Sequence, residues 1–344
     1  MPSRPAAVGP RFSAGRSVAL ASILVVAVLG GAELIARIAG VAPRTRPALV
    51  VRSVDVDIEF PFMRADSELF WSPRPGFHGE FLGRTVTINA LGLRGPEIAV
   101  PKPGGRRRIA CFGDSITFGY GVGDEDTYAF ALERLLAGED VDVVNAGVTG
   151  YTTYQVLRLV RRVAPTLQLD VATFCVGWND ASRRPVDDRT YARRIRTAMA
   201  LEGLARHVYL YRVLQGLYTR WTLRRAEREW DVPPESQRGP LDQYRQNLKL
   251  IVGECRARGV RPIFLELPRR RHAGEEPPAS LHAQAFREAA AELGVLFIDV
   301  GDLGLDSARS PNDEYFIDNL HFSPEGHRYL AERLARELRA RGVL

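Results

Sequence analysis

Cysteine is scarce in this sequence, with three residues among 344, at Cys111, Cys175 and Cys255. So few cysteines exclude the disulfide framework of a small secreted scaffold. Cys111 and Cys175 lie inside apolar, strand-like runs, where a thiol behaves as a small hydrophobic side chain. We therefore expect buried free thiols, with a structural disulfide as the alternative. The cysteines and histidines do not show the spacing of a metal site, so we expect no metal ion.

Lysine is also rare, because Lys102 and Lys249 are the only two and arginine supplies the rest of the 47 basic residues. The formal net charge of +6 and the isoelectric point near 9.4 raise the question of nucleic-acid binding. The densest arginine groups, residues 106–108 and 269–271, are short and flank predicted strands. They lack the interleaved aromatic side chains of a nucleic-acid interface, so we expect no nucleic-acid partner.

One long apolar run is present near the N-terminus, where residues 18–32 carry no charged side chain. About 20 such residues suffice to cross a bilayer, and three arginines within residues 1–16 precede the run. The positive-inside rule then predicts a cytoplasmic basic N-terminus at 1–16 and a single-pass transmembrane signal anchor at 17–41. The rest of the chain would be extracytoplasmic, either periplasmic or at the cell surface.

Two charged residues, Glu33 and Arg37, fall within the predicted anchor. Their spacing places both on one helical face, where they can pair near the membrane boundary. The small residues at 40–42 allow a different interpretation, in which a signal peptide is cleaved there and the protein is secreted.

Residues 42–105 read as a linker and a small β-rich segment. Residues 85–89 alternate apolar and polar side chains as a strand does, within a turn-rich stretch. The aromatic residues of this segment, including Trp71 and Phe77, are expected to pack on the following domain. A carbohydrate-binding role for them is the alternative.

Strand and helix patterns alternate over residues 106–344. This alternation predicts a flavodoxin-like three-layer α/β/α sandwich with a central five-stranded parallel sheet. Residues 171–176 are apolar on both faces, as a central parallel strand should be. The other predicted strands are 108–112, 141–145, 261–267 and 295–300, and the predicted helices are 128–137, 153–163, 244–259, 281–293 and 324–341.

An insertion rich in arginine and aromatic residues interrupts the alternation at about 183–240. Apolar residues recur at helical spacing within 204–221, with arginines between them. We expect a helical hairpin that buries its own aromatic side chains. A lid or membrane-surface helix that guides substrate is the alternative.

A serine with the features of a nucleophile follows the first predicted strand of this domain. Ser115 lies in the stretch GDSITFGYG, where Gly113 allows a tight turn at the carboxyl end of the strand. Ligands of open α/β sheets bind at this edge, and a serine beginning a helical turn has its own N–H free for an anion. On its own, the pattern also fits an ordinary helix cap.

Two further strand ends supply hydrogen-bond donors for an oxyanion. Gly147 ends the second strand, where its backbone N–H can donate and no side chain blocks the substrate. Asn179 follows the third strand, where its amide can donate to the same oxygen. By itself, a glycine such as Gly147 also fits a plain turn. The neighbouring Asp180 is expected to be a cap or turn residue.

The fourth motif places Asp318 three residues before His321. This spacing lets the carboxylate reach one imidazole nitrogen and leaves the other facing Ser115 as a general base. A second histidine, His327, falls on the following helix, where we expect a surface or capping role.

In the order Ser115, Gly147, Asn179 and His321, these motifs resemble the SGNH branch of the GDSL esterase/lipase superfamily. Residues 89–96 additionally resemble an Asn-x-x-Gly-Phe-Arg segment of membrane-anchored bacterial members. The resemblance implies the SGNH hydrolase fold, a Ser115–His321–Asp318 triad and an oxyanion hole of the Ser115 N–H, the Gly147 N–H and the Asn179 side chain. It implies no cofactor and no metal.

The expected activity is that of a serine-dependent ester hydrolase, of esterase, lipase or deacetylase type, acting through an acyl-serine intermediate. The substrate would be a small-molecule, lipid or polysaccharide O-acyl ester, and the membrane would be a partner through the N-terminal helix. A cell-envelope or exopolysaccharide O-acyltransferase with the same triad is an alternative. A non-catalytic envelope assembly protein is a second alternative.

Overall fold

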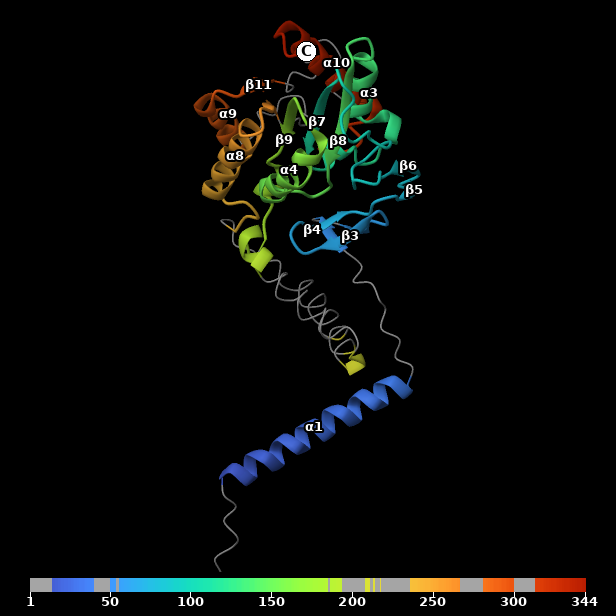
Figure 1. Ribbon diagram of the computed structural model, residues 1–344, viewed down its shortest axis with the longest axis vertical. Coiled ribbons are helices and arrows are strands. Elements are labelled where there is room, and N and C mark those ends of the chain that lie inside the picture. Colours follow the sequence, from blue (N-terminus) through green and yellow to red (C-terminus); the bar gives the residue numbers. More distant parts are fainter. Residues whose placement is uncertain are drawn as a thin grey trace, which may run out of the picture. The chain divides into compact units, whose positions relative to one another are not determined.

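The computed structural model describes residues 14–39, 50–53, 56–184, 186–193, 208–210, 213, 217, 236–266, 281–299 and 313–344. Contacts divide the chain into two compact units. One unit is Met1–Pro47 with Thr197–Asp231, and the other is Ala48–Arg196 with Val232–Leu344. Figure 1 traces both units along the chain.

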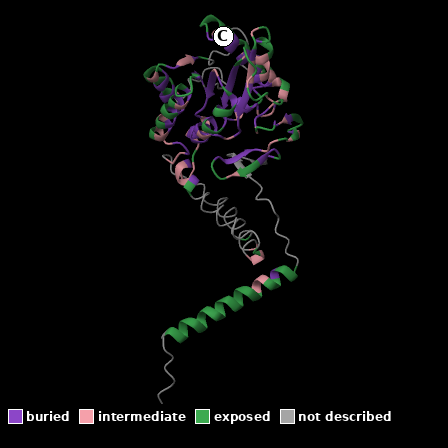
Figure 2. Cartoon of the chain, viewed as in Figure 1, coloured by how far each residue is buried: buried purple, intermediate pink, exposed green. Residues whose placement is uncertain are grey.

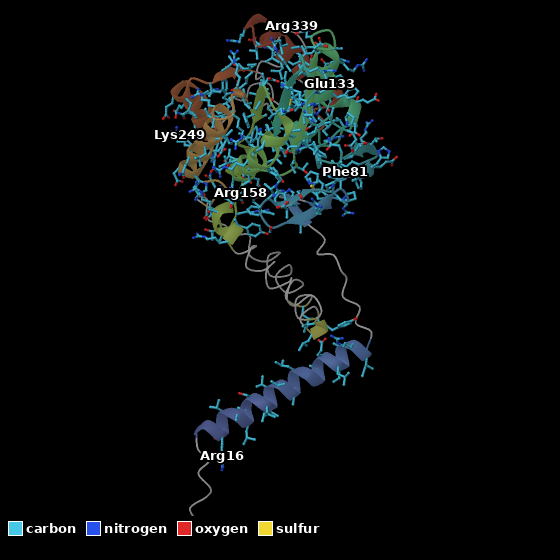
Figure 3. The ribbon with its side chains drawn as sticks, in the orientation of Figure 1. Arg16, Phe81, Glu133, Arg158, Lys249 and Arg339 are labelled. Atoms are coloured by element: carbon cyan, nitrogen blue, oxygen red, sulfur yellow. The ribbon has the colours of Figure 1, made fainter. Side chains whose placement is uncertain are left out.

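The described part of the first unit is dominated by helix α1 (Ala14–Ile38). Its segment Gly15–Ile38 has a mean hydropathy of 2.4 and is long and apolar enough to cross a membrane. Most of α1 is exposed (Figure 2), and Arg16 lies near its amino end (Figure 3). These properties fit either an anchor or a signal sequence.

Glu33 and Arg37, near the carboxyl end of α1, are paired, as their spacing predicts. Arg37 Nε lies 2.7 Å from Glu33 Oε1. The Glu33 carboxylate also accepts hydrogen bonds from the backbone N–H groups of Tyr209 and Leu210, at 3.0 and 2.8 Å. Within the first unit, a short piece of the insertion therefore contacts α1 at its charged end.

The second unit is built on a five-stranded parallel sheet in the order β11-β10-β9-β7-β8. Numbered along the chain, this is the 2-1-3-4-5 order of flavodoxin-like folds, and it confirms the predicted fold. All five predicted strands are present: β7 (Arg107–Gly113), β8 (Val141–Gly147), β9 (Val171–Cys175), β10 (Arg261–Leu265) and β11 (Leu296–Ile298).

Alternate side chains of the strands enter two separate hydrophobic clusters, as the two-residue period of a strand requires. On one face, Ala110 and Phe112 of β7 join a cluster with α4 (Thr153–Leu167), α8 (Leu241–Arg256) and α9 (Leu281–Leu293). On the other face, Ile109 and Cys111 join a cluster with α3 (Tyr128–Leu135) and α10 (Pro324–Ala340). The three layers of the predicted sandwich follow from this division, and Figure 2 shows the buried sheet between them.

The three cysteines are buried free thiols, which confirms the favoured prediction over the disulfide. Burial raises the pKa of Cys111 to about 11 and that of Cys255 to about 12. Thiols with such pKa values are poor nucleophiles, so we assign these cysteines a structural role in the core.

Before the sheet, the described residues form three two-stranded antiparallel hairpins. Their strands are β1 (Val50–Ser53) with β2 (Val56–Glu59), β3 (Met63–Asp66) with β4 (Phe70–Pro73), and β5 (His78–Phe81) with β6 (Arg84–Thr87). Trp71 is 4% exposed and donates from Nε1 to Thr149 O at 2.9 Å. Its ring is part of the core, which agrees with packing and leaves no exposed face for a sugar.

The base of the insertion is closed by backbone pairing. Arg183 and Gln237 form an antiparallel bridge, and Arg184 N donates to Ser236 O at 3.2 Å. Most of the stretch between them lies outside the described residues, as does most of the predicted cytoplasmic segment 1–16. The helical hairpin and the lid both stay predictions.

We expect Trp71→Ala to lower the free energy of unfolding by about 3–5 kcal/mol, because it removes a buried aromatic ring and leaves a cavity. Urea denaturation of the full chain in mild detergent, followed by circular dichroism, measures the change. Leu281→Ala, at a side chain that is 61% exposed, is the control and should stay within about 0.5 kcal/mol of wild type. Equal stability of the two variants would contradict the assignment of Trp71 to the core.

Candidate active site

The sheet register brings the motifs of three strands to one edge. Gly113, at the end of β7, pairs with Gly147 of β8 on one side and with Cys175 of β9 on the other. Ser115 follows β7 and Asn179 follows β9 by a few residues each. The carboxyl ends of these strands therefore place both side chains on the edge where α/β sheets bind ligands.

Ser115 is the first residue of the short helix α2 (Ser115–Phe118). Asp114 caps this helix, because its side chain accepts a hydrogen bond from Ile116 N at 3.0 Å. Gly113 has no room for a side chain, since a Cβ there would overlap Thr117 and the Cys175 carbonyl. The glycine in the motif is therefore required for the sharp turn between strand and helix.

His321 lies on a loop that is closed at its base by a bridge between Phe316 and Phe322. Asp318 lies in the same loop, and one oxygen of its carboxylate accepts hydrogen bonds from the backbone N–H groups of Leu320 and His321, both at 2.7 Å. The second oxygen of the same carboxylate lies 2.7 Å from His321 Nδ1. On the opposite side of the ring, His321 Nε2 lies 2.8 Å from Ser115 Oγ.

These contacts connect Asp318, His321 and Ser115 in one hydrogen-bonded series. Burial raises the pKa of Asp318, but the hydrogen bonds from the His321 side chain and backbone outweigh it and lower the pKa to about 2. The ionised carboxylate accepts the proton of Nδ1, which leaves Nε2 free to accept the hydroxyl proton of Ser115. This series of contacts is the arrangement that activation of a serine requires.

An aromatic residue that the sequence analysis did not single out covers the imidazole. The rings of Tyr120 and His321 have centroids 4.5 Å apart and planes inclined by 35°. Tyr120 lies within the GDSITFGYG stretch, so its closeness to the serine motif was the available signal. Tyr120 therefore packs directly against the His321 ring.

Asn179 lies in a short helical turn, α5 (Trp178–Ala181), at the end of β9. Its Nδ2 donates one hydrogen to Asp114 Oδ2 at 3.1 Å, which orients the amide. An amide nitrogen carries two hydrogens, so the second is available to a ligand. Burial raises the pKa of Asp114 to about 6.

Asp180 is the capping residue that the sequence predicts. Its carboxylate accepts the backbone N–H and the hydroxyl of Thr153 at the start of α4, at 3.0 and 2.6 Å. It is buried, and this burial raises its pKa to about 7.

Gly147 differs from the expectation for an oxyanion donor. Its backbone N–H already donates to Asn145 Oδ1 at 3.0 Å. A Cβ at Gly147 would overlap Thr117 and the Phe118 backbone of α2, so the glycine allows the helix to pack on β8. The structure therefore gives Gly147 a packing role, and its N–H is not free for a reacting carbonyl.

His327 is buried, which corrects the expected surface position, while the capping role is confirmed. Its Nδ1 accepts the backbone N–H of Tyr128, the first residue of α3, at 3.2 Å. Burial, with smaller effects of Arg94 and His321, lowers the pKa of His327 to about 3. The ring is therefore neutral, and its Nδ1 is the acceptor for the first N–H of α3.

The described residues contain no group of three or more His, Cys, Asp or Glu that could hold a metal ion. Within that part of the chain, the polar groups at the sheet edge are a hydroxyl, an imidazole, carboxylates and amide donors. These groups suffice for acyl transfer through serine.

Comparison with known proteins agrees with this chemistry. The family profile of the GDSL-like lipase/acylhydrolase family matches residues 111–329. A search of curated proteins found no match.

Several solved structures are similar to the chain. A lipase/acylhydrolase from Enterococcus faecalis is 24% identical, with 68% of this chain and 96% of that one covered and a TM-score of 0.42. A psychrotrophic esterase from Pseudoalteromonas sp. is 14% identical, with 68% and 97% covered and a TM-score of 0.43. A mutant acetyl-xylooligosaccharide esterase from Geobacillus is 19% identical, with 67% and 94% covered and a TM-score of 0.45. Since the family profile spans more than half of the sequence, this chain belongs to the GDSL-like lipase/acylhydrolase family.

Proposed function

We propose that the chain is a serine ester hydrolase in which Ser115 is the nucleophile, His321 the general base and Asp318 its orienting carboxylate. The observation that carries this proposal is the continuous pair of contacts from Asp318 to His321 and from His321 to Ser115, at 2.7 and 2.8 Å. A hydroxyl, an imidazole and an ionised carboxylate in this order activate a serine for attack on a carbonyl.

The reaction begins when Ser115 Oγ attacks the ester carbonyl carbon and passes its proton to His321 Nε2. The tetrahedral intermediate collapses as the alcohol leaves with that proton, and acyl-Ser115 remains. Water then attacks the acyl carbon and gives a proton to His321. The bond between the acyl carbon and Ser115 Oγ then breaks, Oγ takes the proton back from His321 Nε2, and the carboxylic acid is released. Asp318 stays ionised throughout and stabilises the imidazolium form of His321.

Two donors for the developing oxyanion are supported by the geometry. The Ser115 N–H begins a helix and has no partner within it, and Asn179 has a second amide hydrogen. Each such donor is worth about 3–4 kcal/mol of transition-state stabilisation.

Gly150 is the third donor that we propose, in place of Gly147. Among the described residues its N–H makes no hydrogen bond, and the residue is partly exposed in the loop after β8. Its φ of 78° favours glycine, and its carbonyl accepts Arg238 Nη1 at 2.8 Å. The carbonyl of the peptide unit that carries this N–H, Thr149 O, accepts Trp71 Nε1 at 2.9 Å. The unit is therefore held at its carbonyl while the N–H remains open.

The substrate is an O-acyl ester of a small molecule, a lipid or a polysaccharide, and we propose water as the acyl acceptor. We further propose that α1 remains as an uncleaved membrane anchor with the hydrolase domain outside the cytoplasm. The length, exposure and hydropathy of α1 support this placement.

We expect a fluorophosphonate probe to label the wild-type chain at Ser115 and to leave Ser115→Ala unlabelled, because the probe requires an activated hydroxyl. His321→Ala should lose labelling as well, since no base then accepts the proton. Gel fluorescence and mass spectrometry of the labelled peptide measure both. His78→Ala, at an exposed histidine of β5 outside the site, is the control and should label normally.

Equal labelling of Ser115→Ala and wild type would end the assignment of the nucleophile. Turnover of an aryl acetate, with and without an oligosaccharide, tests the acceptor in the same preparation. Free acetate should match the released phenol in both cases. Acyl groups that appear on the sugar faster than free acid would instead favour the transferase.

A crystal structure of the phosphonylated enzyme should place the phosphonyl oxygen about 2.7–3.1 Å from Ser115 N, Asn179 Nδ2 and Gly150 N. The adduct has the charge and shape of the tetrahedral intermediate, so the contacts of its oxygen identify the groups that donate to the oxyanion. The unmodified enzyme in the same crystal form is the control. A contact with Gly147 N in place of Gly150 N would contradict the third assignment.

The mature protein should retain residues 1–16 and remain in the membrane fraction after an alkaline wash. Val26→Arg, in the middle of α1, should reduce this retention because a central arginine costs about 3 kcal/mol on insertion. Val100→Arg, at an exposed valine of the hydrolase unit, is the matched control and should leave it unchanged. A mature protein that begins near residue 42 and is soluble would show cleavage instead.

A further inference from the structure

An arginine that precedes the sheet is buried beside the serine motif. The side chain of Arg94 is 1% exposed. Its backbone is fixed by bridges to Ile88 and Asn145, and its N–H donates to Asn145 O at 3.2 Å. A buried guanidinium is stable only where its N–H groups find partners, so these partners show what Arg94 holds.

The guanidinium donates mainly to one stretch of chain. Nη1 lies 2.7 Å from both Phe118 O and Gly119 O, and Nη2 lies 2.8 Å from Val122 O. Nε donates to Asp124 Oδ1 at 2.9 Å. The charged group also lies over the Phe118 ring, 4.6 Å from its centroid. A longer contact of 3.4 Å from Nη2 to Thr85 O completes the set.

The first two acceptors are carbonyls at the end of the helix that begins with Ser115. Because α2 covers only Ser115–Phe118, no further helical turn follows to satisfy the Phe118 carbonyl, while Gly119 O also accepts Val122 N at 3.3 Å. Gly119 continues in the left-handed region with φ 89°, and Asn145 Nδ2 also donates to Phe118 O, at 3.3 Å. Arg94 therefore acts as a C-terminal cap on the helical turn of the nucleophile.

The same stretch reaches His321. Tyr120, between the carbonyls that Arg94 holds, lies against the imidazole. Phe81 of β5 packs edge-on against Tyr120 at 5.7 Å, and Figure 3 labels it. Gly121 packs against Ile317 of the histidine loop, where a Cβ would overlap that side chain. Displacing residues 118–122 would therefore disturb both sides of the contact between Ser115 and His321.

We propose that Arg94 is a positioning residue that sets the geometry between Ser115 Oγ and His321 Nε2. It touches neither the substrate nor the reacting atoms, and its role rests on the function proposed above. Lysine cannot replace it, since one ammonium cannot reach acceptors on four residues that the planar guanidinium bonds at once. Through Arg94, the segment before the sheet thus contributes to the geometry of the active site.

Arg108 provides a matched control for substitution of Arg94. Its side chain is 0% exposed and donates to Leu167 O, Ala99 O and Asp142 Oδ2 at 3.0, 2.9 and 2.9 Å. It lies at the amino end of β7, whereas Ser115 follows the carboxyl end. Arg94→Lys and Arg108→Lys therefore remove similar buried hydrogen bonds at opposite ends of one strand.

The experiment compares both variants with wild type as full chains in detergent, below their melting temperatures. Both should show a lower Tm. Arg94→Lys should react with the fluorophosphonate about 10–100-fold more slowly, as expected for reacting groups displaced by about 1 Å, while Arg108→Lys reacts at the wild-type rate. With an aryl ester, Arg94→Lys should lower kcat and leave KM unchanged.

Wild-type labelling by Arg94→Lys would overturn the proposal, and so would equal slowing in Arg108→Lys. Each result would mean that Arg94 contributes stability alone. Failure of the proposed function would look different, because the wild-type chain itself would then remain unlabelled.

Discussion

The register of the parallel sheet is the constraint on which the active site depends. Gly113 pairs with both Gly147 and Cys175, so three strands end together at one edge. A slip of one residue would also send Phe112 and Phe174 to the wrong face of the sheet. These two rings stack at 5.4 Å within the core. The packing that stabilises the domain therefore also aligns Ser115 with Asn179.

The site carries a cost in stability because it buries ionisable groups. Asp114 is 1% exposed, and burial raises its pKa to about 6 from a usual value near 3.9. The folded state thus holds the proton more tightly than the unfolded chain. This contribution to stability is complete below pH about 3.9 and is lost as the pH rises through about 6. Hydrogen bonds from Ile116 N and Asn179 offset part of the cost of the charged form.

Much of this architecture could be predicted from sequence because its signals are local. The strands are short apolar runs and the helices repeat with a regular period, so β7 to β11 were placed within a few residues. Asp318 and His321 were paired from their spacing along one loop, and the serine motif indicated the partner of the imidazole. Both signals, a three-residue separation and the end of a strand, can be recognised without knowing which distant residues are in contact.

The remaining features depend on side-chain contacts that the sequence pattern does not record. The sequence predicts a free backbone N–H at Gly147, whereas in the structure this N–H donates to Asn145 Oδ1. His327 was expected at the surface because the packing of α10 on α3 cannot be read from one helix. Arg94 lies in a segment that the sequence analysis recognised, but its four main acceptors lie 24 to 30 positions further along the chain. The contact is local for Gly147, whereas those of His327 and Arg94 join segments that are distant in the sequence.

The closed base of the insertion has a consequence for how such a domain can diversify. Arg183 and Gln237 pair directly, and the Arg238–Asp188 ion pair at 3.0 Å is buried beside them. The two ends are thus joined independently of the intervening chain. For a flexible connection, a doubling of its length costs only about 0.6 kcal/mol in closure entropy. Natural variation could therefore replace the insertion by one of another length while the pairing at its base is kept.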